Sequence, residues 1–409
     1  MLNRVNFEVA FRALRKDAAT GIDGVTWREY EKELSLNLLD LETRLKEKRY
    51  RAKLVKRVFI PKSNGKLRPI GIPALEDKIV QYVVREILET LFEPIFRESS
   101  FAYRPNRSAK QAALKLQDEL RSWCTWVVES DISGFFDNVS HEWMLKMLER
   151  RVNDRALIGL IRKWLRAGVM QPDGMVEHPE YGTPQGSIIS PVPANIYLHY
   201  ILDLWFEQEV KKRMTGRAFL IRYADDFVVG FRYHSDAQRF FKQLPDRMKK
   251  FGLTLAKEKT RKFMFNRFHK ERSETFDFLG FEYRWVVSRK GKDIIRLRTS
   301  PKRQRRIIQD LKVWFKKNQN KRLWWVLGMV KAKLRGLYNY FGVIGNSSKL
   351  NEMYILYKET LFRLLNRRSQ RKSFNKKTFT YILNQHGIVR HKSRIVDTGI
   401  QESFLSQLA

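Results

Sequence analysis

The chain has 409 residues, 43% of them hydrophobic, which allows two or three domains with apolar cores and excludes a disordered protein. Its 80 Lys and Arg against 44 Asp and Glu give a formal charge of +36 along the whole length, which favours nucleic acid as the partner over an anionic membrane surface. The single cysteine excludes internal disulfides and CxxC zinc sites, and no apolar run reaches membrane-spanning length. We therefore expect a cytosolic protein that binds a large polyanion.

The first part of the chain is predicted to be helical. Apolar residues recur at helical spacing over residues 1–50, and the glycine-containing loop at 20–24 interrupts them. We expect one helix before this loop and a second over about 26–48.

A β-hairpin is predicted next, because apolar and polar residues alternate over 54–73 around the turn 62–65. Lys62 and Arg68 near its tip could hold a triphosphate through charge-assisted hydrogen bonds. A solvated basic hairpin explains the same residues equally well, since Lys and Arg are mostly exposed.

A helix over about 74–92 leads to the loop Phe-Ala-Tyr-Arg-Pro-Asn-Arg-Ser at 101–108. Arg104 and Arg107 in this loop suit contact with a backbone phosphate or a base. They could equally serve packing.

A strand is predicted over 126–132, where the sequence is Trp-Val-Val-Glu-Ser-Asp-Ile. It carries Asp131 near its end, and Gly134 then lets the chain turn toward a helix that includes 143–150. Asp131 at a strand end could contribute to a metal site, whereas Asp137 on the helical side suits a structural or capping role.

A glycine- and proline-rich stretch follows an amphipathic helix at 154–167. Gly182 and Gly186, on either side of Pro184, impose a particular backbone path and permit close approach to a ligand. A further helix is expected over about 193–212.

Two adjacent carboxylates, Asp225 and Asp226, lie between apolar runs in Phe-Leu-Ile-Arg-Tyr-Ala-Asp-Asp-Phe-Val-Val-Gly-Phe at 219–231, a pattern that predicts a hairpin. Like charges at a strand junction repel each other unless a cation compensates them, and hard oxygen ligands favour Mg²⁺ or Mn²⁺. An ordinary solvent-facing Asp-Asp turn is the alternative. With Asp131, three carboxylates could serve two ions in an in-line phosphoryl transfer.

The last third is predicted to hold three basic helices, at 301–316, 323–341 and 349–367, after a helix at 235–251 and a tight hairpin at 275–283. Aromatic residues interleaved with Lys and Arg suit a grip on duplex phosphates. Alternatively, several of these rings are simply core, since large aromatics are usually buried.

Seven motifs in this order resemble the bacterial group II intron-type reverse transcriptase/maturase family, across about residues 7–285. They are IPKSNGKLRPIGIP, FAYRPNRSAKQA, ESDISGFFDNVSH, GTPQGSIISPVPANIYLH, IRYADDFVVGF, LTLAKEKT and FDFLGFEY. Departures from the family pattern, such as Ala256 for the usual Asn and Ser187 for a glycine, remove no metal ligand.

The resemblance implies roles for individual residues. Asp131, Asp225 and Asp226 match the catalytic carboxylates that bind two Mg²⁺ ions, with the backbone carbonyl of Ile132 as a possible further ligand. Phe136 matches the gate that excludes a 2′-hydroxyl. The remaining assignments are nucleotide binding by Lys62, Arg68, Gln185, Gly186 and Lys259, and nucleic-acid binding by Arg104, Arg107, Leu279, Gly280, Arg335, Arg367 and Arg368.

The resemblance also implies an α/β right-hand polymerase fold, with fingers and palm built on antiparallel sheet and an α-helical thumb/X domain after them. We expect an N-terminal helical extension at 1–50, fingers and palm at 51–285, a thumb/maturase-like region at 286–375 and a C-terminal tail at 376–409.

The function implied is an RNA-directed DNA polymerase that copies a bound, structured RNA from a DNA or RNA primer with deoxynucleotides, combined with an intron maturase role. The compact frame leaves open an anti-phage defence reverse transcriptase with a dedicated non-coding RNA. A non-catalytic RNA-binding splicing cofactor is the third alternative, although three buried and unused carboxylates would be costly. The sequence does not indicate the priming mode or the oligomeric state.

Overall fold

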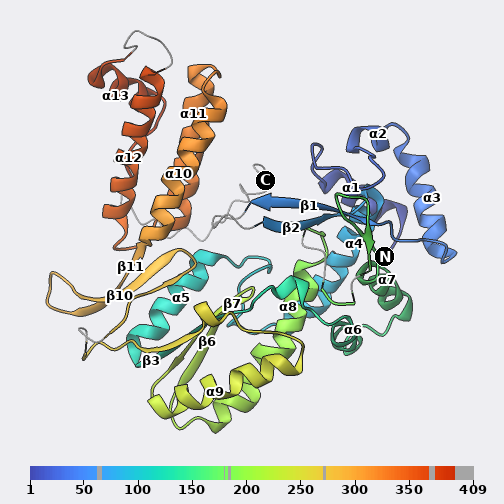
Figure 1. The fold of residues 1–409 in the computed structure, drawn as a ribbon, viewed down its shortest axis with the longest axis horizontal. Helices are drawn as coiled ribbons and strands as arrows, with labels where there is room; N and C mark the ends of the chain where they lie inside the picture. Colours follow the sequence, from blue (N-terminus) through green and yellow to red (C-terminus); the bar gives the residue numbers. More distant parts are fainter. Residues whose placement is uncertain (62–66, 179, 183–185, 270–272, 368–373, 392–409) are drawn as a thin grey trace. The chain divides into compact units, whose positions relative to one another are not determined.

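The structure is a computed structural model that describes residues 1–61, 67–178, 180–182, 186–269, 273–367 and 374–391. The chain divides into two compact units, Met1–Arg107 with Val128–Lys262, and Ser108–Val127 with Phe263–Ala409. Both units combine helices with β-sheet, as the expected α/β class requires (Figure 1). Within the described ranges, no helix is both long and apolar enough to cross a lipid bilayer.

The N-terminal helices of the first unit pack around aromatic residues. A capping box between Thr26 and Glu29 starts α2 (Trp27–Lys32), and Phe11 stacks on Trp27 with ring centroids 4.5 Å apart. The single helix expected over 26–48 is two helices, because the backbone leaves helical geometry at Glu33. The helices are α1 (Arg4–Ala13), α2 (Trp27–Lys32), α3 (Leu34–Lys46) and α4 (Leu75–Phe92).

The predicted hairpin at 54–73 is confirmed and belongs to a small sheet with the order β2-β1-β4-β5. Strand β1 (Val55–Pro61) pairs antiparallel with β2 (Leu67–Ile72). Strand β4 (Val169–Met170) runs parallel to β1 and is followed by β5 (Val176–Glu177), two strands of two residues each that periodicity does not reveal.

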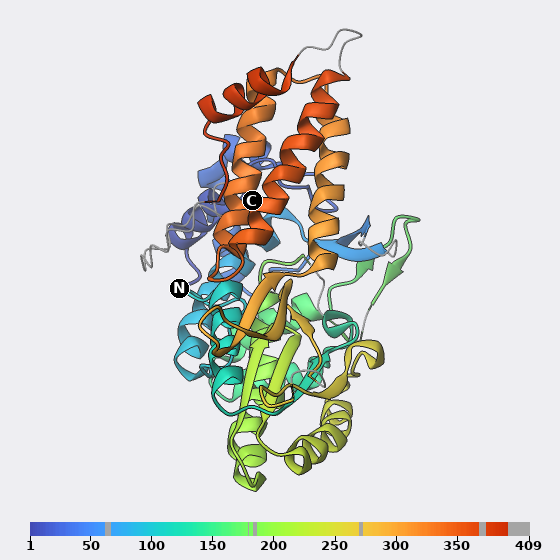
Figure 2. The same ribbon diagram turned by 90° about the vertical axis from the view of Figure 1, so that its left-hand side faces the viewer.

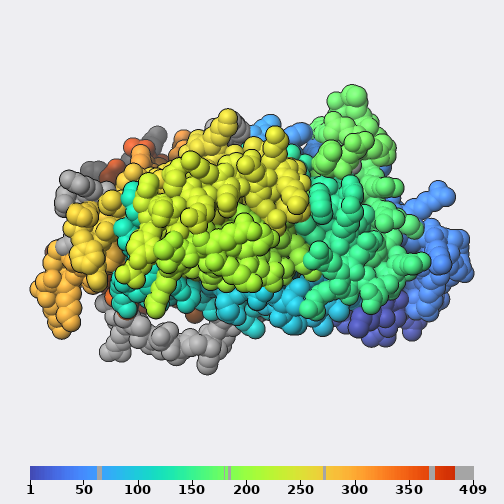
Figure 3. Space-filling view, turned by 90° about the horizontal axis from the view of Figure 1, so that it is seen from below, coloured from blue at the N-terminus to red at the C-terminus, as the bar shows by residue number. Residues whose placement is uncertain are grey.

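The central sheet has the order β6-β7-β3-β8 and includes the predicted Asp-Asp hairpin. Phe227, Val228 and Val229 of β7 (Asp226–Phe231) are fully buried, and α9 (His234–Lys250) packs against this strand. The surface that α9 contributes is part of the green-yellow to yellow face in Figure 3. The elements are β3 (Trp126–Asp131), β6 (Ala218–Tyr223), β7 (Asp226–Phe231), α9 (His234–Lys250) and β8 (Arg261–Met264).

The helix expected over 193–212 is not a uniform α-helix. It starts as α8 (Pro191–Leu198) and continues through the π-helical segments His199–Asp203 (η3) and Phe206–Val210 (η4). Such widened turns are rare and often mark functional sites. The helices α6 (His141–Glu149) and α7 (Arg155–Leu165) pack beside each other, and α6 also packs on α8.

The second unit contains a sheet of order β11-β10-β9 and five helices among its described residues. Helix α5 (Ala109–Ser122) packs on β11, where Gln117 Nε2 donates to the carbonyl of Ile295 at 2.7 Å. The three basic helices are confirmed as α10 (Pro301–Asn318), α11 (Leu323–Phe341) and α12 (Ser347–Asn366), which run alongside one another in Figure 2. The other elements are β9 (Phe276–Phe278), β10 (Phe281–Val287), β11 (Asp293–Thr299) and α13 (Lys376–Gln385), a helix that the sequence pattern did not predict.

Candidate active site

Three aspartates lie at the ends of neighbouring strands in the central sheet. Asp131 is the last residue of β3, and Asp226 is the first residue of the adjacent strand β7. Asp225 shares a two-residue turn with Ala224, closed by the pairing of Tyr223 with Asp226. Ala224 has a φ of 58°, in the left-handed region that hairpin turns of this length use. The fold therefore brings together the three carboxylates expected to bind metal.

Burial and mutual repulsion raise the pKa values of two of these carboxyl groups. Burial is the largest cause at Asp226 and, with the charges of Asp131 and Asp225, raises its pKa to about 7. Burial and then the Asp131 charge also raise the pKa of Asp225. The positive charge of Lys259 acts in the opposite direction on both. The cluster thus carries negative charge that the fold compensates only in part.

Lys259 supplies a positive charge at the edge of this cluster. Its Nζ donates a hydrogen bond to Asp131 Oδ2, and this bond is the largest cause of its raised pKa. The Lys259 side chain is 62% exposed. Next to it, the hydroxyl oxygens of Ser130 and Thr260 are 3.0 Å apart, so the two segments stay in register beside the carboxylates. Because Lys259 offsets only part of the negative charge of the three carboxylates, the cluster can accept a further cation.

The donor chemistry fits a hard divalent cation, because carboxylate oxygens are the ligands that Mg²⁺ and Mn²⁺ prefer. Within the described ranges, no three His, Cys, Asp or Glu side chains already converge on one point. Binding a cation at all three aspartates would therefore require Asp131 to exchange its contact with Lys259. Ile132 is buried directly after β3 and forms an isolated bridge with Leu255.

Phe136 lies close to the carboxylates in sequence, on the short 3₁₀ turn Phe135–Asp137 (η2) that follows Asp131. Gly134 starts this turn with a φ of 55°, and the half-buried Phe136 ring contacts Phe135 edge to face. Gly182 lies against the same turn, since a Cβ there would come within 3.0 Å of the Phe136 carbonyl oxygen. The glycine therefore permits the predicted nucleotide-binding loop to approach the predicted gate.

Gly186 lies against β2. A Cβ on this residue would come within 2.7 Å of Ile70 Cγ2, and its φ of 104° also favours glycine. Arg68 on the same strand is exposed, and its charge lowers the pKa of Asp225. Arg68, Gly186 and the carboxylates therefore belong to one region of the first unit. Lys62 and Gln185, the other predicted nucleotide ligands of this region, lie outside the described residues.

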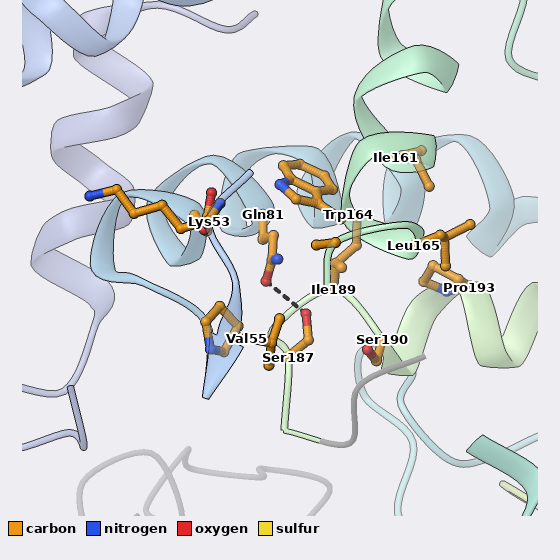
Figure 4. Close-up of a pocket in the computed structure, with 13 residues that line it drawn as sticks. Lys53, Val55, Gln81, Ile161, Trp164, Leu165, Ser187, Ile189, Ser190 and Pro193 are labelled. Carbon is orange, nitrogen blue, oxygen red and sulfur yellow. Dashed lines mark hydrogen bonds between the residues drawn. The ribbon is translucent and has the colours of Figure 1, made fainter. Parts of the chain in front are cut away.

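A cavity of about 30 Å³ lies between β1, α4, α7 and the start of α8 (Figure 4). Ser187 donates to Gln81 Oε1 at 2.7 Å across it, which ties the residue after Gly186 to α4. Burial raises the pKa of Asp77 at the same cavity to about 6, although hydrogen bonds from Tyr50 and from the Lys53 amide oppose the shift. The cavity has room for little more than a water molecule and is too small to hold a nucleotide. The Ser187–Gln81 hydrogen bond supports the loop after Gly186.

Arg104 is committed to partners within the first unit. Its guanidinium donates to both carboxylate oxygens of Glu93 and to the carbonyls of Arg97 and Ser100, and its side chain is 4% exposed. This geometry agrees with the packing alternative. Arg107 pairs with Glu98 at 2.5 Å and lies over the Phe101 ring. Nucleic-acid contact by either arginine stays a prediction.

Tyr103, in the same loop, is a site residue that the sequence alone did not single out. It has a φ of 56° and is 45% exposed. Burial of part of the ring and the charge of Asp225 raise its pKa, while Arg68 acts in the opposite direction. Tyr103 therefore shares the region of Asp225 and Arg68. The available signal was an aromatic residue directly before Arg104 in a loop that carries two arginines.

The predicted primer-contacting residues Leu279 and Gly280 form the turn between β9 and β10 in the second unit. Both have positive φ, and Tyr340 donates its hydroxyl to the Leu279 carbonyl at 3.0 Å. Arg335 on α11 and Arg367 after α12 are exposed. Arg368 lies outside the described residues.

Comparison with known proteins gives a consistent set of matches. The sequence profile of the family described as "Reverse transcriptase (RNA-dependent DNA polymerase)" matches residues 60–283. Protein YkfC from Escherichia coli (strain K12) is 35% identical over 240 residues, which are 51% of this chain and 62% of that protein. Group II intron-encoded protein LtrA from Lactococcus lactis subsp. cremoris is 28% identical over 394 residues, covering 75% of this chain and 63% of that protein.

This chain therefore spans less than two thirds of the length of either relative. Among solved structures, telomerase from Candida albicans in complex with a fragment of telomeric RNA matches with a TM-score of 0.47 and 12% identity, covering 88% of this chain and 71% of that chain. This structural likeness is too weak to carry an argument about function.

Proposed function

Because the chain belongs to the reverse transcriptase family, we propose that it is an RNA-directed DNA polymerase that copies a bound RNA by adding deoxynucleotides to a primer 3′ end. The observation that carries the proposal is the group formed by Asp131, Asp225 and Asp226 inside the matched segment. Burial, and after it the repulsion between these carboxylates, raises the pKa values of Asp225 and Asp226, as expected of a site that binds cations.

Asp131, Asp225, Asp226 and the carbonyl of Ile132 would hold two Mg²⁺ ions, or Mn²⁺ in their place, which activate the 3′-hydroxyl and stabilise the leaving pyrophosphate. Once the Lys259 ammonium group has left the Asp131 carboxylate, it would bind a phosphate of the nucleotide or donate a proton.

The other site residues would orient the incoming nucleotide. The exposed Arg68 would bind the triphosphate through its planar fork of donors, and Gly186 would allow close backbone approach. Phe136 would exclude a 2′-hydroxyl and so select deoxynucleotides. Lys62 and Gln185 complete this proposed set.

The second unit would bind nucleic acid. In the proposed division, residues 51–285 form fingers and palm, 286–375 the thumb, and 1–50 and 376–409 the flanking parts. Leu279 and Gly280 would contact the primer, and the exposed arginines Arg335 and Arg367 would contact phosphates of a duplex.

For the RNA partner we favour a structured RNA of group II intron type. The alignment with LtrA, described as a group II intron-encoded protein, extends over 75% of this chain, beyond the catalytic segment alone. A maturase role would follow if the protein promotes splicing of that RNA. The experiment tests this role against two alternatives. One is a defence enzyme that uses a dedicated non-coding RNA, and the other is an RNA-binding scaffold without catalysis.

The test is extension of a DNA primer on an RNA template with Mg²⁺ and deoxynucleotides. The wild type is compared with Asp225→Asn/Asp226→Asn and with Asp236→Asn, which removes a buried carboxylate charge from the start of α9. We expect extension by the wild type and by Asp236→Asn, and a loss of more than about 100-fold in the double variant, since even groups that only support metal ligands contribute 10- to 100-fold.

Equal extension by the double variant would contradict the proposed site. If no protein extends while all bind RNA equally, the assay is repeated with RNA that co-purifies from cells. Failure on that RNA as well would favour an RNA-binding scaffold. The identity of the co-purified RNA separates intron RNA from another non-coding RNA.

A further inference from the structure

A buried ion pair lies directly behind the turn that carries Asp225 and Asp226. Arg222 on β6 and Asp203 on the π-helical segment are both fully buried. Arg222 Nε is 2.8 Å from Asp203 Oδ1, and Nη2 is 2.6 Å from Oδ2, so the pair is bidentate. Apolar replacements for such pairs are often neutral or stabilising, so stability alone does not explain the pair.

The Arg222 guanidinium has an acceptor for every N–H group. Besides Asp203, Nη1 donates to Asn195 Oδ1 at 2.9 Å and to the Ala224 carbonyl at 3.2 Å, and Nη2 donates to Ser100 Oγ at 2.8 Å. Lysine has three donors and no planar fork, so it cannot make the same set of contacts.

One of these contacts acts on the turn itself. The carbonyl of Ala224 belongs to the peptide group that joins Ala224 to Asp225. Ala224 itself has the unfavourable φ of 58°. A non-glycine residue in the left-handed region persists only where its surroundings hold it. The guanidinium therefore fixes the peptide from which the Asp225 side chain departs.

The same arginine connects the turn to two other elements. Its amide donates to the Ser99 carbonyl at 2.7 Å, and its carbonyl accepts from the Phe101 amide at 3.0 Å. Asn195 on α8 donates in turn to the Ala102 carbonyl at 2.8 Å. Through its backbone and its side chain, the buried Arg222 thus joins the turn, the Tyr103 loop and α8.

We propose that Arg222, held by Asp203, is a positioning residue that sets the orientation of the 224–226 turn and so places the Asp225 and Asp226 carboxylates for cation binding. Arg222 touches neither substrate nor metal in this account. The inference rests on the proposed polymerase function, because it assigns a purpose to that geometry.

The test compares Mn²⁺ binding and primer extension in Arg222→Lys, Asp203→Asn and the wild type. Mn²⁺ binding is followed by the electron paramagnetic resonance signal of free Mn²⁺, with dNTP and a chain-terminated primer on RNA template, so that no turnover occurs. Asp236→Asn is the matched control. Asp236 is also fully buried, but it accepts from the Thr215 and Gly216 amides near the opposite end of the β6–β7 hairpin.

We expect Arg222→Lys and Asp203→Asn to weaken Mn²⁺ binding and to lower kcat by about 10- to 100-fold, the effect usual for groups that support metal ligands, with KM for dNTP within about 3-fold. Asp236→Asn should leave Mn²⁺ affinity unchanged even if it lowers thermal stability. Variants that fold and bind Mn²⁺ as the wild type does would overturn the proposal. Equal weakening in Asp236→Asn would also overturn it, because the effect would then report general destabilisation.

Ser100→Ala keeps the test decisive if the larger changes prevent folding. It removes one acceptor from Nη2 and leaves the ion pair intact, so a reduction of about 3- to 10-fold in Mn²⁺ affinity is expected, the size of one lost hydrogen bond. Wild-type affinity in Ser100→Ala, with Arg222→Lys unfolded, would count against the proposal. Failure of the polymerase function itself is a separate result, because it would appear as a wild type without extension or as unchanged Mn²⁺ binding in Asp225→Asn/Asp226→Asn.

Discussion

In the first unit, the fully buried carboxylate of Asp203 lies near the partly buried carboxylates of Asp225 and Asp226, and the protein compensates their charges to different extents. Asp203 is fully buried and receives two guanidinium hydrogen bonds from Arg222. Asp225 and Asp226 instead have raised pKa values, because burial and neighbouring carboxylates disfavour their charged forms. The negative charge of Asp203 is neutralised within the protein and so helps to hold the fold in place. The charge of Asp225 and Asp226 is not fully neutralised and so can bind a cation from solution.

The largest expected effect on stability comes from breaking the internally neutralised pair. Asp203→Asn removes the charge partner of Arg222 and should lower the free energy of unfolding by about 3–5 kcal/mol, the usual cost of a lone buried charge. Urea denaturation measures it. A change below about 1 kcal/mol would show that Arg222 is not electrostatically dependent on Asp203.

Neutralising one of the two partly buried carboxylates should have the opposite sign. Asp226→Asn removes a carboxylate whose charged form is disfavoured first by burial and then by the charges of Asp131 and Asp225, which together raise its pKa from 3.8 to about 7. We expect the metal-free protein to gain roughly 2–4 kcal/mol of unfolding free energy at about pH 8, while primer extension is lost. Destabilisation by Asp226→Asn under these conditions would contradict the proposed excess of negative charge.

The pH dependence should follow the same group. Because the folded form of Asp226 keeps its proton up to about pH 7 and the ordinary pKa is 3.8, the unfolding free energy should fall as pH rises through this window. Mg²⁺ should raise the unfolding free energy by about 1 kcal/mol at about pH 8 and by much less at about pH 5, where protonation of the carboxylate competes with metal binding. Thermal melting with Mg²⁺ and with EDTA measures this. The Asp225→Asn/Asp226→Asn variant is the control and should show no Mg²⁺ effect.

The smallest expected effect concerns the turn that carries Asp225. Ala224→Gly relieves the left-handed φ of 58° but adds freedom to the unfolded chain, so the net gain in stability should be below about 1 kcal/mol. Thermal melting of the two proteins side by side would detect it. A loss of more than about 1 kcal/mol would show that the Ala224 methyl group, buried at this position, contributes packing that outweighs the strain.

The Asp-Asp hairpin could be predicted because its signals are local. Apolar runs on both sides of a short polar turn define the strands, and two like charges in that turn suggest a cation site. The strand ending at Asp131 is recognised in the same way. No local pattern indicates which strands pair. That the Asp131 strand and the Asp-Asp hairpin belong to one sheet was therefore expected only from the order of the family motifs.

Other features depend on contacts between residues far apart in the chain. Arg104 in its loop has the same sequence signature whether it faces a phosphate or, as here, both oxygens of Glu93. An arginine inside the apolar strand Ala218–Tyr223 does signal a need for a buried partner, but nothing local identifies Asp203, 19 residues earlier. The two-residue strands β4 and β5 are too short for any periodicity to show.

The division of the chain is also a long-range property. Helix α5 precedes β3 in sequence but belongs to the second compact unit, where Tyr283 donates its hydroxyl to the Ala113 carbonyl at 3.0 Å. The order of motifs along the chain cannot reveal that a segment packs in a different unit from its sequence neighbours.

The proposed metal site is tested most directly by locating Mn²⁺ through anomalous diffraction in crystals of the protein with a primer, an RNA template and dNTP. We predict Mn²⁺ within about 2.0–2.3 Å of oxygens of Asp131, Asp225 and Asp226, with Lys259 released from Asp131. Mn²⁺ bound elsewhere, with the Lys259–Asp131 contact retained, would contradict the account.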